Sequence, residues 1–141
     1  MINEEIKILN NLAHYTDQTN KTRIVIGDTY TYGMSHLDLF HNPRNVEKKC
    51  PHFSITRKGE IYKHFNLSNY SDYLDINPKF NITIALENVS ILKEINNEYF
   101  DIYNNKYEGE VYSRKWKTIE HWIPYTKSQF DSLIYLLVDL K

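Results

Sequence analysis

The histidines and the single cysteine are the side chains here with metal-ligand chemistry, because imidazole nitrogens and thiolates bind zinc. A metal site could be drawn from six residues: His36, His41, His52, His64, Asp28 and Cys50. Spacing argues against it, since His36 and His41 are five residues apart and miss the i,i+4 register in which two helical side chains share a metal. A two-residue turn also predicts that His52 and His64 point to opposite faces of a hairpin. We interpret these histidines as polar or partly buried side chains.

Glu87 and His52 are the candidates for acid–base catalysis, although neither belongs to a recognisable catalytic pattern. Glu87 ends an apolar strand, where a carboxylate stays in solvent or pairs with a lysine; the alternative is a groove position that faces a ligand. Cys50 is a conceivable nucleophile, but no base is spaced to activate it. We interpret Cys50 as a small semi-buried residue.

The second half of the chain is dense in aromatic residues. The set comprises Tyr99, Phe100, Tyr103, Tyr107, Tyr112, Trp116, Trp122 and Tyr125. Exposed rings of this kind stack on sugars or form protein interfaces, whereas buried ones would form a second small core. Arg114, Lys115 and Lys117 surround Trp116, and we interpret this basic cluster as a solvated face rather than a nucleic-acid site.

Three strand patterns position these residues. Arg23 to Ile26 is continuously apolar after its first residue and predicts a buried strand that ends at Gly27-Asp28-Thr29. His52 to Phe65 alternates on both sides of Lys58-Gly59 and predicts a β-hairpin. Asn81 to Glu87 predicts another apolar strand, and Glu98 to Tyr112 resembles an inserted excursion.

Helical patterns flank these strands. Asn3 to His14 has an amphipathic pattern, and Ser35 can cap a brief helix to His41 that Asn42-Pro43 would end. Thr126 and Gln129 form a capping box before a closing helix. We therefore expect an α/β (α+β) fold over residues 1–141, one domain with a central mixed sheet flanked by helices.

Composition sets the class of protein. The 141 residues are 41% hydrophobic and 25% charged with a formal charge of −1, typical of a soluble globular domain. This balance predicts neither nucleic-acid nor membrane binding. The first residues match neither a signal peptide nor a membrane span, so we expect a cytoplasmic or phage-associated protein.

Four segments, in order, resemble type-2 N-acetylmuramoyl-L-alanine amidases, the family that includes peptidoglycan recognition proteins and amidase-type phage lysozymes. They are IVIGDT (24–29), HFSITRKGEIYKHF (52–65), NITIALEN (81–88) and PYTKSQFDSLIYLLVDL (124–140). The resemblance implies the amidase fold and a phage or bacterial, endolysin-like source. It also implies cleavage of the amide between N-acetylmuramic acid and L-alanine by a zinc-bound water.

The chain departs from that family at the zinc ligands. The first ligand, a histidine after the first strand, corresponds to Gly27. The other two come from a segment beyond the final helix, and this chain ends at Lys141. The family's assisting glutamate corresponds to Ala85, with Glu87 two residues later, and Pro51 replaces the tyrosine before His52. We therefore expect no bound zinc or other cofactor, and no metal ligands.

The resemblance leads us to expect a peptidoglycan-directed domain that is inactive or incomplete as an amidase and binds muropeptides or cell wall. Its groove would be formed by Gly27, Asp28, Thr29, His52, Glu87 and Asn88. Two alternatives remain. One is a module that reuses the fold to bind a protein partner, and the other is an active amidase with a relocated metal site.

Overall fold

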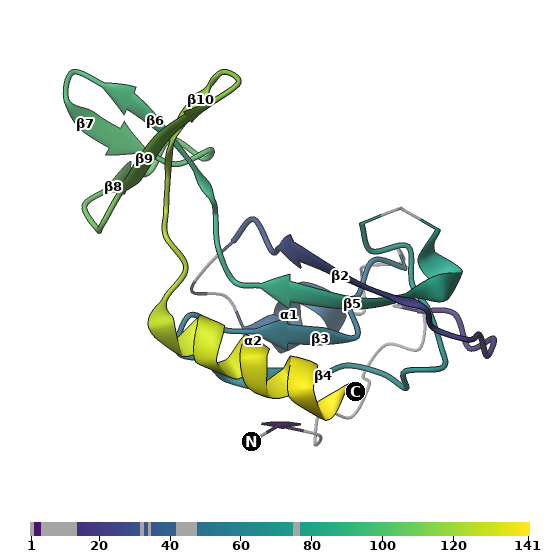
Figure 1. Cartoon of the computed structure of the whole chain (residues 1–141). Coiled ribbons are helices and arrows are strands. Elements are labelled where there is room, and N and C mark those ends of the chain that lie inside the picture. Colours follow the sequence, from purple (N-terminus) through teal and green to yellow (C-terminus); the bar gives the residue numbers. More distant parts are fainter. Residues whose placement is uncertain (1, 4–13, 32, 34, 42–47, 75–76) are drawn as a thin grey trace.

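A five-stranded mixed sheet forms the body of the molecule in this computed structural model, which describes residues 2–3, 14–31, 33, 35–41, 48–74 and 77–141 (Figure 1). The strand order is β1-β4-β3-β5-β2. The strands are β1 (Ile2–Asn3), β2 (Arg23–Asp28), β3 (Phe53–Ile55), β4 (Ile61–Lys63) and β5 (Asn81–Leu86). β3 is antiparallel to β4, and the other neighbours are parallel. The predicted central mixed sheet is confirmed, but the prediction of a buried strand at Arg23 to Ile26 is wrong, because β2 is an edge strand in which Ile24 and Ile26 are 41% and 45% exposed.

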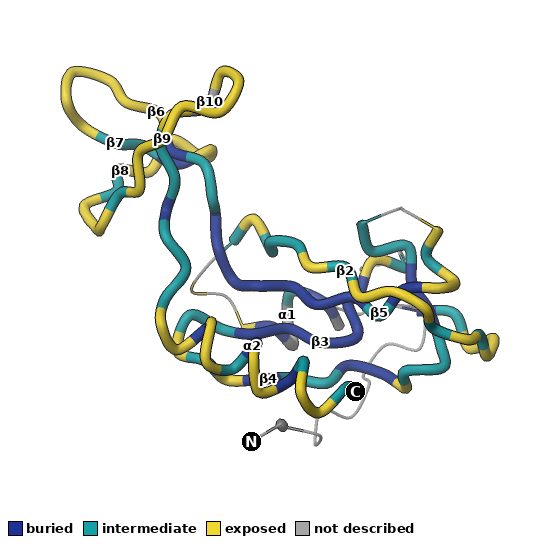
Figure 2. Tube along the Cα trace, in the orientation of Figure 1, coloured by how far each residue is buried: buried dark blue, intermediate teal, exposed yellow. Residues whose placement is uncertain are grey.

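Helix α2 (Lys127–Asp139) packs on one face of this sheet, as its capping box predicts. The Thr126 hydroxyl accepts from the Gln129 amide, and the Gln129 side chain accepts from the Thr126 amide. The main core joins sheet and helix through Phe53, Ile55, Ile61, Ile84, Leu86, Leu133 and Leu136. Each such buried side chain contributes about 1.5–3 kcal/mol, so this core, dark blue in Figure 2, accounts for much of the folding free energy.

The short helix α1 (His36–His41) lies on the opposite face, as expected for Ser35 to His41. Its Phe40 packs with Cys50, Phe65 and Ala85 in a second, smaller cluster. Burial raises the pKa of the Cys50 thiol well above its ordinary value, which suppresses the reactive thiolate. The predicted end of this helix at Asn42-Pro43 lies outside the described residues.

The hairpin β3–β4 corrects one prediction. Thr56 pairs with Glu60, and the His64 amide donates to the His52 carbonyl at 2.9 Å, so the turn holds three residues rather than two. The third is Gly59, whose φ of +88° favours glycine. This one-residue difference places His52 and His64 opposite each other on the same face, so the prediction of opposite faces is wrong.

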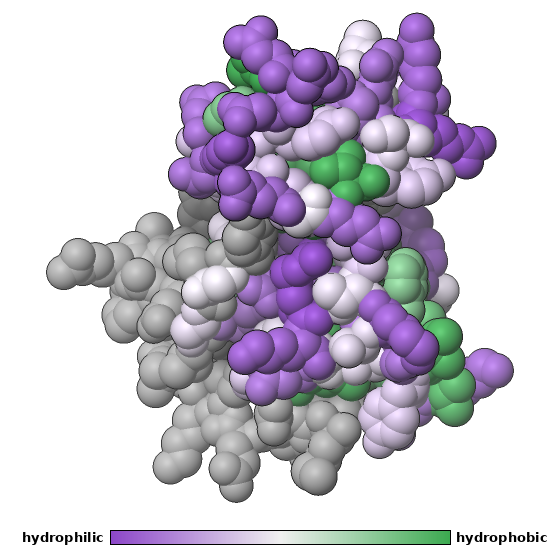
Figure 3. Space-filling view, turned by 90° about the vertical axis from the view of Figure 1, so that its left-hand side faces the viewer, coloured by the Kyte–Doolittle hydropathy of each residue, from purple (hydrophilic) through white to green (hydrophobic). Residues whose placement is uncertain are grey.

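A second sheet projects from the body, and we call residues 91–122 the arm (Figure 1). Its antiparallel order is β8-β7-β6-β10-β9. The strands are β6 (Ile91–Ile95), β7 (Glu98–Phe100), β8 (Lys106–Tyr107), β9 (Tyr112–Trp116) and β10 (Ile119–Trp122). The expected excursion is therefore larger than the sequence pattern of residues 98–112 indicated. Figure 3 shows the arm above the body, hydrophilic over most of the visible face with small apolar areas among the polar side chains.

The remaining elements connect the layers. A 3-10 helix, Pro78–Phe80, leads into β5. Tyr15 forms a backbone bridge with Tyr70, and the amphipathic pattern of Asn3 to His14 falls largely outside the described residues. Within the described parts of the chain, no helix is both long enough and apolar enough to cross a membrane.

Candidate functional site

A cleft of about 890 Å³ lies where the arm meets the body. The ends of β2 and β5, the arm and the start of α2 all contribute to its lining. The polar, charged and aromatic residues of the lining are Asp28, Tyr30, Asn88, Ser90, Tyr112, Arg114, Lys115, Trp116, Trp122, Tyr125 and Phe130. Sites of this size bury most of a drug-sized ligand. Asp28 and Asn88, two residues of the predicted groove, lie in this lining.

Asp28 ties the base of the cleft together. Ser90, on the segment that leads into the arm, and Tyr125, on the segment that leaves it, both donate hydroxyl hydrogen bonds to the Asp28 carboxylate. Burial and the hydrogen bond to Asp28 raise the pKa of the Tyr125 phenol, which keeps that phenol a donor. The side-chain amide of Asn88 donates to the Ile123 carbonyl at 2.9 Å and so joins the two segments directly.

A further hydrogen bond connects the arm to the loop after β2. The Tyr103 hydroxyl donates to the Tyr30 carbonyl at 2.9 Å. This bond joins the arm itself to the body, while the bonds at Asp28 and Asn88 hold the two segments that connect them. The base of the cleft is therefore fixed by hydrogen bonds, which lowers the entropic cost of ordering it around a ligand.

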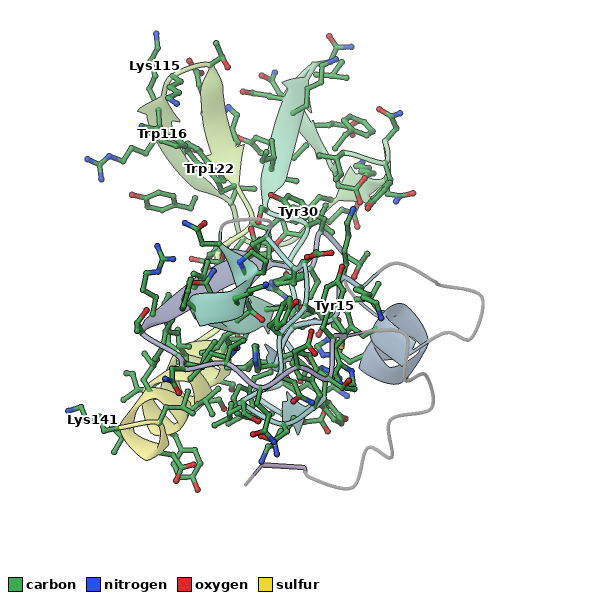
Figure 4. All side chains as sticks on the ribbon, turned by 90° about the vertical axis from the view of Figure 1, so that its right-hand side faces the viewer. Tyr15, Tyr30, Lys115, Trp116, Trp122 and Lys141 are labelled. Carbon is green, nitrogen blue, oxygen red and sulfur yellow. The ribbon has the colours of Figure 1, made fainter. Side chains whose placement is uncertain are left out.

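Aromatic rings supply most of the wall. Tyr112 and Trp122 lie side by side across β9 and β10, with ring centroids 6.4 Å apart. Trp116 is 61% exposed and Phe130 is 49% exposed. Lys115, Trp116 and Trp122 project on the side of the molecule where α2 lies, with Tyr30 at the foot of the arm (Figure 4).

The structure divides the aromatic set between a small arm core and the cleft lining. Tyr99 and Tyr107 pack against Val89, Leu92 and Ile123 in a small arm core. Four other members of the set, Tyr112, Trp116, Trp122 and Tyr125, line the cleft. The second small core is therefore confirmed for Tyr99 and Tyr107, whereas stacking on sugars or on a protein partner stays a prediction for the rings that line the cleft.

The other residues of the predicted groove lie elsewhere. Gly27 and Thr29 do not line the cleft, although the Thr29 hydroxyl accepts from the backbone amide of Asn88 at 3.3 Å. His52 is 1% exposed and Glu87 is 7% exposed, both on the face that α1 covers. The structure therefore brings Asp28 and Asn88 together and separates them from His52 and Glu87.

Glu87 connects three parts of the body rather than facing solvent or a lysine. Its carboxylate accepts from the Gly33 amide at 2.7 Å and from the Arg57 amide at 2.8 Å. His36 Nε2 lies 3.9 Å from the same carboxylate. Because both oxygens already accept backbone hydrogen bonds, we assign Glu87 to folding and not to a ligand.

The buried histidines His36, His52 and His64 are hydrogen-bonded to hydroxyls of the body, although His36 Nε2 has no hydrogen-bond partner among the described residues. Ser54 bridges His36 Nδ1 at 2.5 Å and His64 Nε2 at 2.7 Å, but the serine is fully buried and no substrate can reach it. His52 contacts the Thr83 hydroxyl at 3.0 Å and the Asn69 carbonyl at 2.9 Å. Burial lowers the pKa of His52 to about 4, so it is neutral at pH 7.

The family's zinc does not fit the residues present at its first ligand position. Gly27 offers no donor atom, and a Cβ built there would lie 2.8 Å and 2.9 Å from the two Leu74 methyl carbons. No three His, Cys, Asp or Glu side chains are grouped for a metal ion in the part of the chain that the structure describes. The expectation of no bound zinc stays a prediction, and the Gly27 geometry supports it.

Sequence reasoning missed the contributions of Tyr30, Ser90 and Phe130 to the cleft. For Tyr30 and Ser90 no periodic signal exists, because they lie in connections whose path depends on the tertiary fold. Alternation gives no signal in β9 either, because a register shift against β10 interrupts the strand between Tyr112 and Trp116.

Comparison with known proteins gives no matching family model, curated protein or solved structure. The geometry of the cleft therefore carries the functional argument.

Proposed function

We propose that this chain binds peptidoglycan fragments in the cleft between the arm and the body, without cleaving them. The observation that carries the proposal is the cleft itself, an aromatic wall of Tyr112, Trp116 and Trp122 facing fixed polar groups at Asp28 and Asn88. The sequence resemblance to peptidoglycan amidases agrees with this choice of ligand.

The chemistry of the lining suits a sugar with an attached peptide. The apolar face of a pyranose ring packs on exposed aromatic rings such as Trp116. The hydroxyl and amide groups of the ligand need polar partners, which the base of the cleft supplies at the partly exposed hydroxyls of Ser90 and Tyr125. Both hydroxyls are already oriented by Asp28, so binding orders few side chains.

The proposal separates binding from cleavage. Amide hydrolysis at neutral pH needs an activated water or nucleophile, together with groups that stabilise the oxyanion. At the cleft, the Asp28 carboxylate already accepts hydrogen bonds from two hydroxyls, those of Ser90 and Tyr125. Ser54 and Cys50 are buried away from the cleft. We therefore assign recognition, and no bond-breaking step, to this site.

Two assays with purified protein test the proposal. Co-sedimentation with intact sacculi is expected to retain the chain, and dye-labelled cell walls are expected to release no dye. A Trp116→Ala variant should reduce retention, whereas Tyr135→Ala, which removes a comparably exposed ring from α2, should not. Robust dye release would contradict the non-catalytic proposal and favour a relocated metal site.

A second candidate function, protein recognition, has one observation in its favour. The outer side of α2 exposes Ile134, Tyr135 and Val138, each by more than half. Apolar surface of this kind is typical of interaction sites. Failure to co-sediment with sacculi, combined with no response of the cleft tryptophans to muropeptides, would move the assignment to this candidate.

A further inference from the structure

Two basic side chains line the cleft near the tip of the β9–β10 hairpin. Arg114 and Lys115 are exposed, and both belong to the cleft lining. Among the described residues, no carboxylate lies within ion-pair distance of either. Figure 4 shows Lys115 at the end of the arm, next to Trp116.

Two other cations of the arm, Lys106 and Lys117, are engaged. Lys106 pairs with Glu98 at 2.6 Å and approaches Glu108 at 3.6 Å, while Lys117 lies over the Trp116 ring at 4.9 Å from its centroid. The contrast shows that acidic partners are available on the arm but are not placed beside Arg114 and Lys115. Their charge remains free to meet a ligand.

The only carboxylate in the cleft lining does not offset these cations. Asp28 lies at the base of the cleft, where Ser90 and Tyr125 direct their hydroxyl hydrogens to it. Hydrogen bonds of this kind stabilise the negative charge locally and occupy the acceptor sites that a cationic ligand group would need. The cleft therefore has a positive outer end and an inner end that holds the hydrogen-bonded Asp28 carboxylate, with the aromatic wall between them.

We infer that the cleft selects saccharides that carry an anionic group, with the sugar ring on the aromatic wall and the anion at Arg114 and Lys115. The inference rests on the proposed function and narrows its ligand class. Arg presents a planar donor fork that matches a carboxylate or a phosphate in two-point contact, and Lys adds a second charge. Both anions occur on bacterial cell-wall saccharides, as a carboxylate of muropeptides and as a phosphate ester.

A matched set of small saccharides tests the inference with the full chain. The probes are N-acetylglucosamine as the neutral sugar, N-acetylmuramic acid as the carboxylate, its methyl ester as the neutral isostere, and N-acetylglucosamine 6-phosphate as the phosphate. Intrinsic fluorescence reports binding, because the chain has two tryptophans and both line the cleft. We expect the anionic sugars to bind about tenfold more tightly than the neutral ones, as one charged hydrogen-bonded contact provides.

Two double variants locate the effect. Arg114→Gln with Lys115→Gln should remove the tenfold preference for the anionic sugars. Lys58→Gln with Lys93→Gln makes the same change in net charge at exposed lysines outside the cleft, and should keep the preference. High salt should also reduce the preference, because exposed charges are screened over about 3 Å at 1 M ionic strength.

The outcomes separate this inference from the proposed function. A preference for either anion that the cleft double variant abolishes supports the inference, and the stronger of the two probes identifies the carboxylate or the phosphate as the source. Equal binding of neutral and anionic sugars, or a preference that survives in the cleft double variant, overturns the inference while the proposed function stands. No binding of any sugar, muropeptide or sacculus overturns both.

Discussion

The polar face beneath α1 and the cleft beneath the arm meet at two consecutive residues. Glu87 points into the body, where its carboxylate accepts the Gly33 and Arg57 amides. Asn88 points toward the cleft, where its amide joins the two connections of the arm. Alternation along an extended chain sends neighbouring side chains to opposite sides, so one backbone segment serves both regions.

The difference lies in how far each region exposes its polar groups to solvent, since beneath α1 even the unpartnered His36 Nε2 is buried. Under α1, Ser54 bridges two histidines, and His52 has partners on both ring nitrogens. In the cleft, Arg114, Lys115 and Trp116 are exposed to solvent, with Lys117 over the Trp116 ring. The serine and histidine side chains beneath α1, which are types common in active sites, therefore have structural roles. The exposed side chains of the cleft are arginine, lysine and tryptophan, which are less reactive.

The largest expected effect comes from breaking the buried region. Glu87→Ala leaves the Gly33 and Arg57 amides without an acceptor, and each hydrogen bond to a charged group contributes about 1.5–3 kcal/mol. We expect the free energy of unfolding to fall by about 4 kcal/mol, measured by urea denaturation. Glu87→Gln, which keeps one oxygen, should lose about half as much. A loss below about 1 kcal/mol for the alanine variant would refute the assignment of Glu87 to folding.

Acid should weaken the buried region next. The pKa of His52 falls to about 4 in the folded state, so the unfolded chain binds the proton more readily. The stabilisation is complete above pH 6.5 and is lost as the pH falls toward 4, with a total of about 3 kcal/mol. Burial lowers the pKa of His36 too, so the two effects add.

Urea denaturation at pH 7, 6 and 5 measures this loss before most carboxylates titrate. A His52→Gln variant should show a shallower decline over the same range. Stability that is flat or rises between pH 7 and 5 would show that the two histidines are not held neutral.

Changes in the cleft should act on binding and not on folding. Trp116→Ala removes a ring that is 61% exposed, so the free energy of unfolding should change by less than about 0.5 kcal/mol. The affinity for a muropeptide should fall about tenfold, as expected for the loss of one stacking contact. Isothermal titration calorimetry measures the affinity, with Tyr135→Ala as the matched control. Equal affinities for wild type and Trp116→Ala would show that the aromatic wall does not contribute to muropeptide binding.

The smallest expected effect concerns the attachment of the arm. Tyr103→Phe deletes the exposed hydrogen bond to the Tyr30 carbonyl and keeps the ring. Such a bond contributes about 0.5 kcal/mol, so we expect about a twofold loss of muropeptide affinity and faster amide exchange at the base of the arm. An unchanged exchange rate would indicate that the bonds at Asp28 and Asn88 fix the arm without it.

The body was largely predictable because its signals are local. The capping box at Thr126 and Gln129 set the start of α2, and the apolar runs of β2 and β5 identified their positions in one sheet. The register of β3 and β4 was not predictable from alternation alone. It depends on Gly59, which has a positive φ and packs against the backbone of α2. A Cβ at this position would lie only 2.8 Å from the backbone oxygen of Ser128.

The site was predictable only in part. Asp28 and Asn88 follow apolar strands, and side chains at the ends of parallel strands gather at one edge of a sheet. The role of the arm could not be deduced in the same way, because its strands are short and exposed on most faces. Its position over Asp28 is set by hydrogen bonds from Ser90, Tyr125 and Tyr103, each distant in sequence from its partner.

The most direct test of the central claim is a titration of ¹⁵N-labelled protein with a disaccharide muropeptide, followed by NMR. The chain has two indole N–H signals, and both tryptophans line the cleft. The account predicts that both indole signals shift in a saturable manner, while the amides of His52 and Glu87 stay in place. Shifts confined to the face beneath α1, or indole signals unmoved at saturating muropeptide, would contradict it.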